Sequence, residues 1–234
     1  MIPIRILTQP NDTTCGPTSL HAVYNYYGKN ISLKQVISEV SYLEEGGTLA
    51  VMLGIDALKN GFKAKIYTYN LLVFDPTWFK EKEVNLIEKL RKQLKHKKST
   101  RLHKATKSYI EFLEKGGEIL FKDLNPTMLK KQFAKNIPVL TGLSATYLYN
   151  CSRETTDEND NSIYDDVRGN SAGHFVVLCG YDEEKKNVIV ADPYKENPLS
   201  GNNYYSVKIG RLINSILLGI VTYDANLLII EKRD

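Results

Sequence analysis

The sequence predicts an α+β protein in which a helical first half packs against an antiparallel sheet formed by the second half. Helix-type periodicity extends to about residue 134 of the 234-residue chain, and β-type runs separated by turn signals follow it. Apolar residues make up 42% of the chain and charged residues 25%, which is the balance of a globular protein. Because helices come early and strands late, we expect the functional site to lie between the two halves.

Three helices are expected at the start of the chain, after a loop at 9–15. The first carries apolar residues at helical spacing between positions 20 and 27 and ends at Gly28. Ser32 is expected to cap the second helix. Thr48 is expected to cap the third, which stops at Gly61. The alternating segment FKAKIYTY that follows predicts a strand.

The middle of the chain is predicted to be helical and basic. A helical pattern runs from about residue 80 to 115 with an interruption near Ser99, and a short helix follows, with Asn125 at its cap and Pro126 at its first position. From Lys80 to Lys107 there are 11 Lys or Arg residues against 3 Glu, although the net charge of the whole chain is only +4. Such a run is either a solvated helical face or a docking surface for an acidic partner, of which nucleic acid is an unlikely example.

The second half contains four β-type runs: IPVLTGLSATYLY, HFVVLCGYD, NVIVAD and NLLIIEK. The segment VKIGRLINSILLG predicts a helix before the last of them. A polar stretch at 150–173 carries six acidic residues and is too long for an ordinary turn. We therefore expect one domain over 1–234, with a basic helical insertion at about 75–117 and a polar flap at about 150–173.

Composition and cysteine usage indicate a cytoplasmic protein with reduced thiols. The N-terminus shows no secretory signal, and no apolar run approaches the roughly 20 residues of a membrane span. The three cysteines, Cys15, Cys151 and Cys179, fit neither a disulfide framework nor a metal site. No metal or other cofactor is expected, and the oligomeric state is left open.

Cys15 is the candidate nucleophile because it stands at the mouth of the first predicted helix. The thiolate is the reactive form of cysteine, and the N-terminus of a helix favours a negative charge. Gly16 and Pro17 follow it and preset the first turn. Taken alone, Cys15 could equally be a small buried hydrophobe, as most free cysteines are.

His174 is the candidate base. His21 lies on the same helix as Cys15 but points elsewhere, and His96 and His103 fall in the basic region, where solvation is expected. His174 begins one β-type run and Asp192 ends the next, so the two can lie side by side across a hairpin. The carboxylate would then hold the imidazole by its second nitrogen.

Gln9 is the candidate oxyanion donor. Acyl transfer through a thiolate places negative charge on the carbonyl oxygen of the substrate, and a preorganised donor aimed at that oxygen contributes roughly 3–4 kcal/mol. The side-chain amide of Gln9 and the backbone N–H of Cys15 could form such a pair if the loop folds over the helix mouth.

The segments QPNDTTCG, GHFVVLCGYD and ADPY together resemble the papain-like cysteine peptidases. The resemblance is closest to the bacteriocin-leader-processing group, family thirty-nine of the cysteine peptidases. It implies a papain-like fold, with Cys15 as nucleophile, His174 as base, Asp192 as its orienter and Gln9 as oxyanion donor. The 159 residues between Cys15 and His174 exceed the spacing expected for processing domains, so the double-glycine leader specificity is not carried over.

The leading hypothesis is a free-standing thiol hydrolase that cleaves a peptide or amide bond through an acyl-enzyme. An acyl or peptidyl transferase with the same triad remains open, because an amine can replace water in the last step. A non-catalytic papain-like binding module is the rival class. We expect a peptide or protein substrate, and the basic segment suggests an acidic one.

Overall fold

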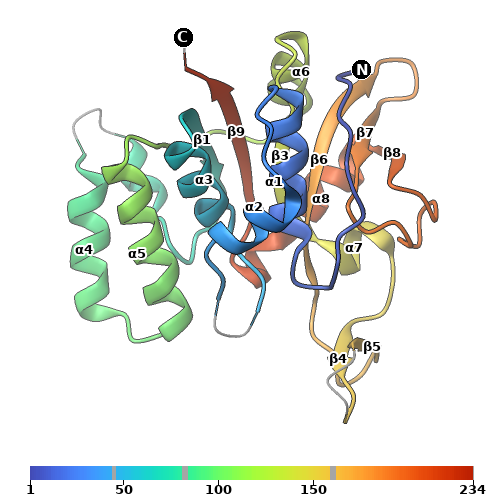
Figure 1. The fold of residues 1–234 in the computed structure, drawn as a ribbon. Helices are drawn as coiled ribbons and strands as arrows, with labels where there is room; N and C mark the ends of the chain where they lie inside the picture. Colours follow the sequence, from blue (N-terminus) through green and yellow to red (C-terminus); the bar gives the residue numbers. More distant parts are fainter. Residues whose placement is uncertain (44–45, 81–83, 159–161, 234) are drawn as a thin grey trace.

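The computed structural model describes residues 1–43, 46–80, 84–158 and 162–233, and it confirms the α+β class. A seven-stranded sheet forms its centre, in the order β2-β1-β9-β3-β6-β7-β8 (Figure 1). The β1–β2 pair at one edge is parallel, and the other neighbouring pairs are antiparallel. The seven strands are β1 (Phe62–Thr68), β2 (Glu118–Leu120), β3 (Val139–Ser144), β6 (Gly173–Asp182), β7 (Asn187–Ala191), β8 (Tyr204–Lys208) and β9 (Asn226–Lys232).

Helices cover both faces of this sheet. The expected helical half packs on one face through α1 (Cys15–Tyr26), α2 (Leu33–Glu39), α3 (Ala50–Lys59), α4 (Leu86–His96) and α5 (Thr100–Glu114) (Figure 1). The opposite face carries α6 (Pro126–Ala134), α7 (Ala145–Tyr149) and α8 (Ile209–Leu218). Two short 3-10 helices, η1 (Pro76–Phe79) and η2 (Gly219–Thr222), complete the helical elements of the described residues.

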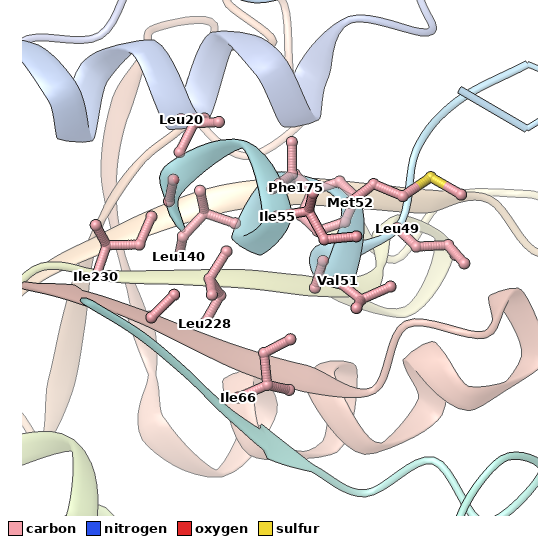
Figure 2. Close-up of a cluster of buried hydrophobic side chains, with 14 of the residues drawn as sticks. Leu20, Leu49, Val51, Met52, Ile55, Ile66, Leu140, Phe175, Leu228 and Ile230 are labelled. Carbon is pink, nitrogen blue, oxygen red and sulfur yellow. The ribbon is translucent and has the colours of Figure 1, made fainter. Parts of the chain in front are cut away.

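Strand alternation divides the core into two apolar clusters. On β6, Phe175 and Val177 face the N-terminal helices, whereas Val176 and Leu178 face α7 and α8. The first cluster includes Leu20 of α1, with several side chains of α3 and β9 (Figure 2). Because both faces of the central strands are covered, these strands read as continuous apolar runs in the sequence.

Most of the expected helix ends are present. Gly28 follows α1 with a positive φ of 79°, and the side chains of Ser32, Ser99 and Asn125 accept hydrogen bonds at the starts of α2, α5 and α6. The prediction for Thr48 is wrong, because its hydroxyl donates to the carbonyl of Ser41.

The third helix is capped from a distant part of the chain. The carboxylate of Asp224 accepts a hydrogen bond from the backbone N–H of Ala50, the first residue of α3, at 3.0 Å. A buried carboxylate at this end satisfies an N–H group that the helix itself leaves unpaired. Its contribution could not be predicted locally, because 174 residues separate the two partners.

Two further corrections concern the second half. Residues 145–149, expected to continue a β-type run, form α7, since the hydroxyl of Ser144 caps this helix by accepting from Tyr147 N. The start of VKIGRLINSILLG belongs to β8, a strand that the sequence analysis did not identify.

The basic segment contains a pair of packed helices, and the polar stretch contains a β-hairpin. In the former, α4 and α5 pack against each other at one side of the molecule. In the latter, β4 (Glu154–Thr156) pairs with β5 (Ser162–Tyr164) and projects beyond the main sheet (Figure 1). Residues 81–83 and 159–161 of these two predicted segments lie outside the described residues. Across the described ranges, no helix combines the length and apolar character needed to cross a membrane.

Candidate active site

Cys15 is the first residue of α1, and close packing fixes this helix end against β6. A Cβ on Gly16 would lie 2.5 Å from the Thr48 side chain and 3.3 Å from the Phe175 ring, so only glycine fits here without a shift. The hydroxyl of Ser19 donates to the carbonyl of Phe175 at 3.2 Å. Because Phe175 follows His174 directly, these contacts hold the Cys15 end of the helix beside that histidine.

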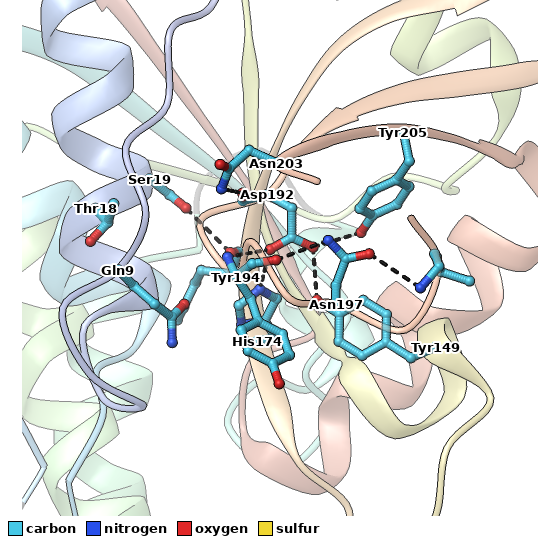
Figure 3. A network of polar contacts seen from close by, with 12 residues as sticks. Gln9, Thr18, Ser19, Tyr149, His174, Asp192, Tyr194, Asn197, Asn203 and Tyr205 are labelled. Carbon is cyan, nitrogen blue, oxygen red and sulfur yellow. Dashed lines mark hydrogen bonds and ion pairs between the residues drawn. The ribbon is translucent and has the colours of Figure 1, made fainter. Parts of the chain in front are cut away.

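The predicted pair of His174 and Asp192 is formed across neighbouring strands (Figure 3). Strands β6 and β7 are antiparallel, His174 stands near the start of β6, and Asp192 follows the end of β7. His174 Nε2 donates to Asp192 Oδ1 at 2.8 Å. Both side chains are enclosed, with 7% of His174 and none of Asp192 exposed.

His174 lies beside Cys15, and the two residues line the same cavity. Burial by itself would lower the pKa of His174, but the charge of Asp192 and hydrogen bonds to Asp192 and Cys15 raise that pKa above its ordinary value. Since Nε2 is bonded to Asp192, Nδ1 is the ring nitrogen left for Cys15. The structure thus brings the three residues together: the imidazole is hydrogen-bonded to Asp192 and lines one cavity with Cys15.

Asp192 is held by more partners than sequence reasoning identified. Its Oδ1 also accepts from the backbone N–H of Tyr194 at 2.8 Å, and Oδ2 accepts from the hydroxyls of Tyr149 and Tyr205, each at 2.7 Å (Figure 3). Burial would raise the pKa of Asp192, but His174 and the two tyrosine hydroxyls lower it overall. The carboxylate therefore stays charged and fixed in a dry position.

The two tyrosines come from elements that were mispredicted or missed. Tyr149 ends α7, which was expected to be strand, and Tyr205 lies on β8, which was not identified. The only available signal was general: a buried tyrosine usually finds a partner for its hydroxyl. Nothing in the local sequence indicates that this partner is Asp192.

Gln9 lies close to the same residues. Its backbone N–H donates to the carbonyl of Pro193 at 2.9 Å, which ties the loop before α1 to the residue after Asp192. Its side-chain Nε2 donates to the carbonyl of Asn11 at 3.0 Å, which accounts for one of its two N–H groups. Gln9 also borders a cavity together with His174.

The surface around His174 is hollowed into two neighbouring cavities. One, of about 320 Å³, is lined by Cys15, Arg101, Phe175 and Asp224 among others. The second, of about 190 Å³, is lined by Gln9 and by residues of the β4–β5 hairpin. Asp12, Gly173 and His174 border both cavities, so the two adjoin at these residues, and together they are called the cleft.

The remaining cysteines and histidines lie in other surroundings. Cys179 is buried, and burial raises the pKa of its thiol to about 11; burial also raises the pKa of Cys151. All three cysteines are free. His21 is buried beside Asn25, and His96 is exposed, as expected.

The α+β fold, with helices packed on both faces of a central sheet, is that of the papain-like cysteine peptidases. Within that class, the model of the Peptidase_C39 like family matches residues 1–212, and the chain belongs to this family. A comparison with curated proteins finds no match.

Several solved structures of peptidases are similar to this chain at low sequence identity. A C39-like peptidase from Bacillus anthracis is 18% identical, with a TM-score of 0.52 over 100% of this chain and 97% of the other. The double glycine motif protease of an AMS/PCAT transporter, solved with its leader peptide, is 16% identical, with a TM-score of 0.45 over 99% and 94% of the chains. Xylellain, a cysteine protease from Xylella fastidiosa, is 14% identical, with a TM-score of 0.43 over 100% and 85%.

Proposed function

We propose that this cysteine peptidase cleaves a peptide or amide bond by means of Cys15, His174, Asp192 and Gln9. The observation that carries the proposal is the position of His174, which lines a cavity together with Cys15 and donates from Nε2 to the Asp192 carboxylate at 2.8 Å. A raised histidine pKa favours the imidazolium, which stabilises a neighbouring thiolate.

The chemistry follows from this arrangement. The sulfur of Cys15 attacks the carbonyl carbon, and the Gln9 side chain and the Cys15 backbone N–H stabilise the resulting oxyanion. His174 then gives its proton to the leaving nitrogen as the C–N bond breaks, which leaves a thioester. Water, deprotonated by His174, attacks the thioester and releases the acid and the thiol. If an amine takes the place of water, the same steps make the protein an acyl transferase.

The substrate is proposed to be a peptide or protein, and the basic segment 80–107 suggests an acidic one, although Asp12 and Asp224 line the cavity beside Cys15 together with one arginine. Arg101, a member of the basic segment 80–107, lines that cavity. Its guanidinium donates to the carbonyl of Thr222 at 3.1 Å and stacks over the Tyr223 ring, so its charge is held at the cleft. The exposed lysines of α4 lie far from the β4–β5 hairpin in Figure 1, which argues against a clamp between these two segments. The cytoplasmic location stays a prediction.

Selective alkylation tests the proposal. Iodoacetamide at about pH 6, read by mass spectrometry, should label Cys15 well before Cys151 and Cys179, because burial raises the thiol pKa of the latter two. His174→Ala should slow the labelling of Cys15, and Cys15→Ala should remove both the fast labelling and any peptide cleavage. Equal labelling of Cys15 and Cys151 would contradict the catalytic assignment and favour a binding module.

A further inference from the structure

The cavity beside Gln9 and His174 is walled by the β4–β5 hairpin. Glu154 from β4 and Ile163 and Tyr164 from β5 line it, opposite Tyr149 and Tyr194. Its volume of about 190 Å³ is below the roughly 300–1,000 Å³ of ordinary small-molecule sites, so it suits one or two amino-acid side chains.

Given the proposed function, the position of this cavity indicates which part of a substrate binds in it. The acyl part of the substrate becomes bonded to Cys15, which lines only the other cavity. The leaving nitrogen must reach His174, which acts as its proton donor. The segment after the scissile bond therefore passes from His174 into the cavity that Cys15 does not line.

The charge of this cavity is negative. Asp12 and Glu154 line it, and no lysine or arginine stands among its described lining residues. The charge of His174 is faced by the Asp192 carboxylate. Burial first, and then the charges of Glu196, Asp12 and Glu154, raise the pKa of Tyr194.

The arginines of the same polar stretch do not neutralise the cavity. Arg153 donates to the backbone carbonyls of Asp166 and Val167, and Arg168 pairs with Asp165 at 2.6 Å. Each is engaged with the loop of 165–168 that follows the hairpin, so the carboxylates of the cavity lining keep their charge available to a ligand.

The lining also suits the shape of a long cationic side chain. The Glu154 carboxylate is oriented by the hydroxyl of Ser162, which donates to it at 2.9 Å. Tyrosine rings offer apolar surface to an aliphatic stem and an electron-rich face to a cation. A lysine or arginine uses both properties, whereas an acidic side chain would face two carboxylates.

We infer that this cavity is the subsite for the residue immediately after the scissile bond, and that it selects lysine or arginine through Asp12, Glu154 and the tyrosine rings. The β4–β5 hairpin is thereby a specificity element of the enzyme. It acts on the leaving side of the bond, separately from any preference that Arg101 exerts on the acyl side.

The test uses the full chain and two readouts. The first is cleavage of a diverse peptide library, with the residue after each cut identified by mass spectrometry. The second is binding of lysinamide and of its neutral analogue norleucinamide to the Cys15→Ala protein, which is measured by NMR titration. Each readout compares the protein that keeps Glu154 with the protein that carries Glu154→Lys, at low and at moderate salt. Glu158→Lys is the matched control, since it makes the same change in the same polar stretch without lining the cavity.

We expect lysine or arginine at the position after the cut. We also expect lysinamide to bind at least about fivefold more tightly than norleucinamide, since its ammonium group can pair with the two exposed carboxylates. Glu154→Lys should abolish both preferences, Glu158→Lys should leave them in place, and salt should weaken them. Cleavage that ignores the residue after the cut would overturn the inference and leave the proposed function standing. Lack of cleavage would count against the proposed function, and the binding arm then decides: equal binding of the two amides overturns the inference.

Discussion

Removing the hydroxyl of Tyr205 should destabilise the protein through Asp192, in a manner that depends on pH. Asp192 is fully buried and accepts four hydrogen bonds, one of them from Tyr205 at 2.7 Å. Tyr205→Phe keeps the ring and deletes only the donor. A hydrogen bond to a charged group contributes about 1.5–3 kcal/mol, so we expect the free energy of unfolding to fall by that amount at about pH 7.

The pH dependence follows from the lowered pKa of Asp192. A carboxylate whose pKa is lower in the folded state adds stability above its unfolded pKa, and this stability is lost as the pH falls through the folded value. Tyr205→Phe raises the folded pKa, because it removes one of the groups that lower it. Acid therefore protonates Asp192 in the variant before it does so in the wild type, and the difference in stability shrinks as the pH falls.

Urea denaturation of both proteins at a series of pH values measures this difference. Tyr27→Phe is the matched control, since the Tyr27 hydroxyl donates to an uncharged acceptor, the carbonyl of Ile230, at 2.8 Å. Its loss should cost about 0.5–1.5 kcal/mol and should not vary with pH. If Tyr205→Phe behaves like Tyr27→Phe in size and in pH dependence, the tyrosine does not support a charged Asp192.

Three further outcomes are expected. Burial raises the pKa of Asp224 to about 7, so between about pH 4 and pH 7 the unfolded state binds fewer protons than the folded state, and stability falls as the pH rises through this range. Asp224→Asn should remove that fall in denaturation experiments across the same range, because the asparagine side-chain oxygen can still accept a hydrogen bond at the start of α3. Ser32→Ala should cost about 1 kcal/mol in thermal or urea unfolding, because it deletes the cap of α2, and an unchanged midpoint would contradict the capping assignment. Charge reversal at Lys92, Lys95 and Lys98 should weaken any preference for acidic over neutral peptides at low salt; a preference that survives reversal would mean that this part of the basic segment is only a solvated surface.

The parts of the fold that sequence reasoning predicted are those encoded locally. The caps at Ser32 and Asn125 act within three residues of themselves, so their residue type and spacing were sufficient. The interruption expected near Ser99 is likewise the start of α5, which the Ser99 side chain caps. The neighbouring positions of His174 and Asp192 also depend on local structure, because two adjacent β-type runs joined by a short turn form a hairpin.

Long-range contacts account for the errors. Thr48 has the right residue type for a cap, but Asp224 from the other end of the chain takes that place. Tyr149 reaches Asp192 only because the chain after Ser144 turns into α7 rather than continuing as strand. No pattern within a window of ten or fifteen residues contains either partner, so such contacts are visible only in three dimensions.

The same distinction explains why the site was easier to predict than its specificity. Cys15 and His174 each stand at the start of a regular element, where the residue type alone suggests chemistry. The walls of the cleft come from the loop before α1, from α5 and from β4–β5, and their lining residues Asp12, Arg101 and Glu154 are more than 50 positions apart in the chain. Their charges can be interpreted only after the fold places Arg101 in the cavity beside Cys15 and Glu154 in the cavity beside Gln9. A substrate with an acidic residue before the scissile bond and a basic residue after it is therefore the most informative first peptide, because exchanging those two residues tests both halves of the cleft in one comparison.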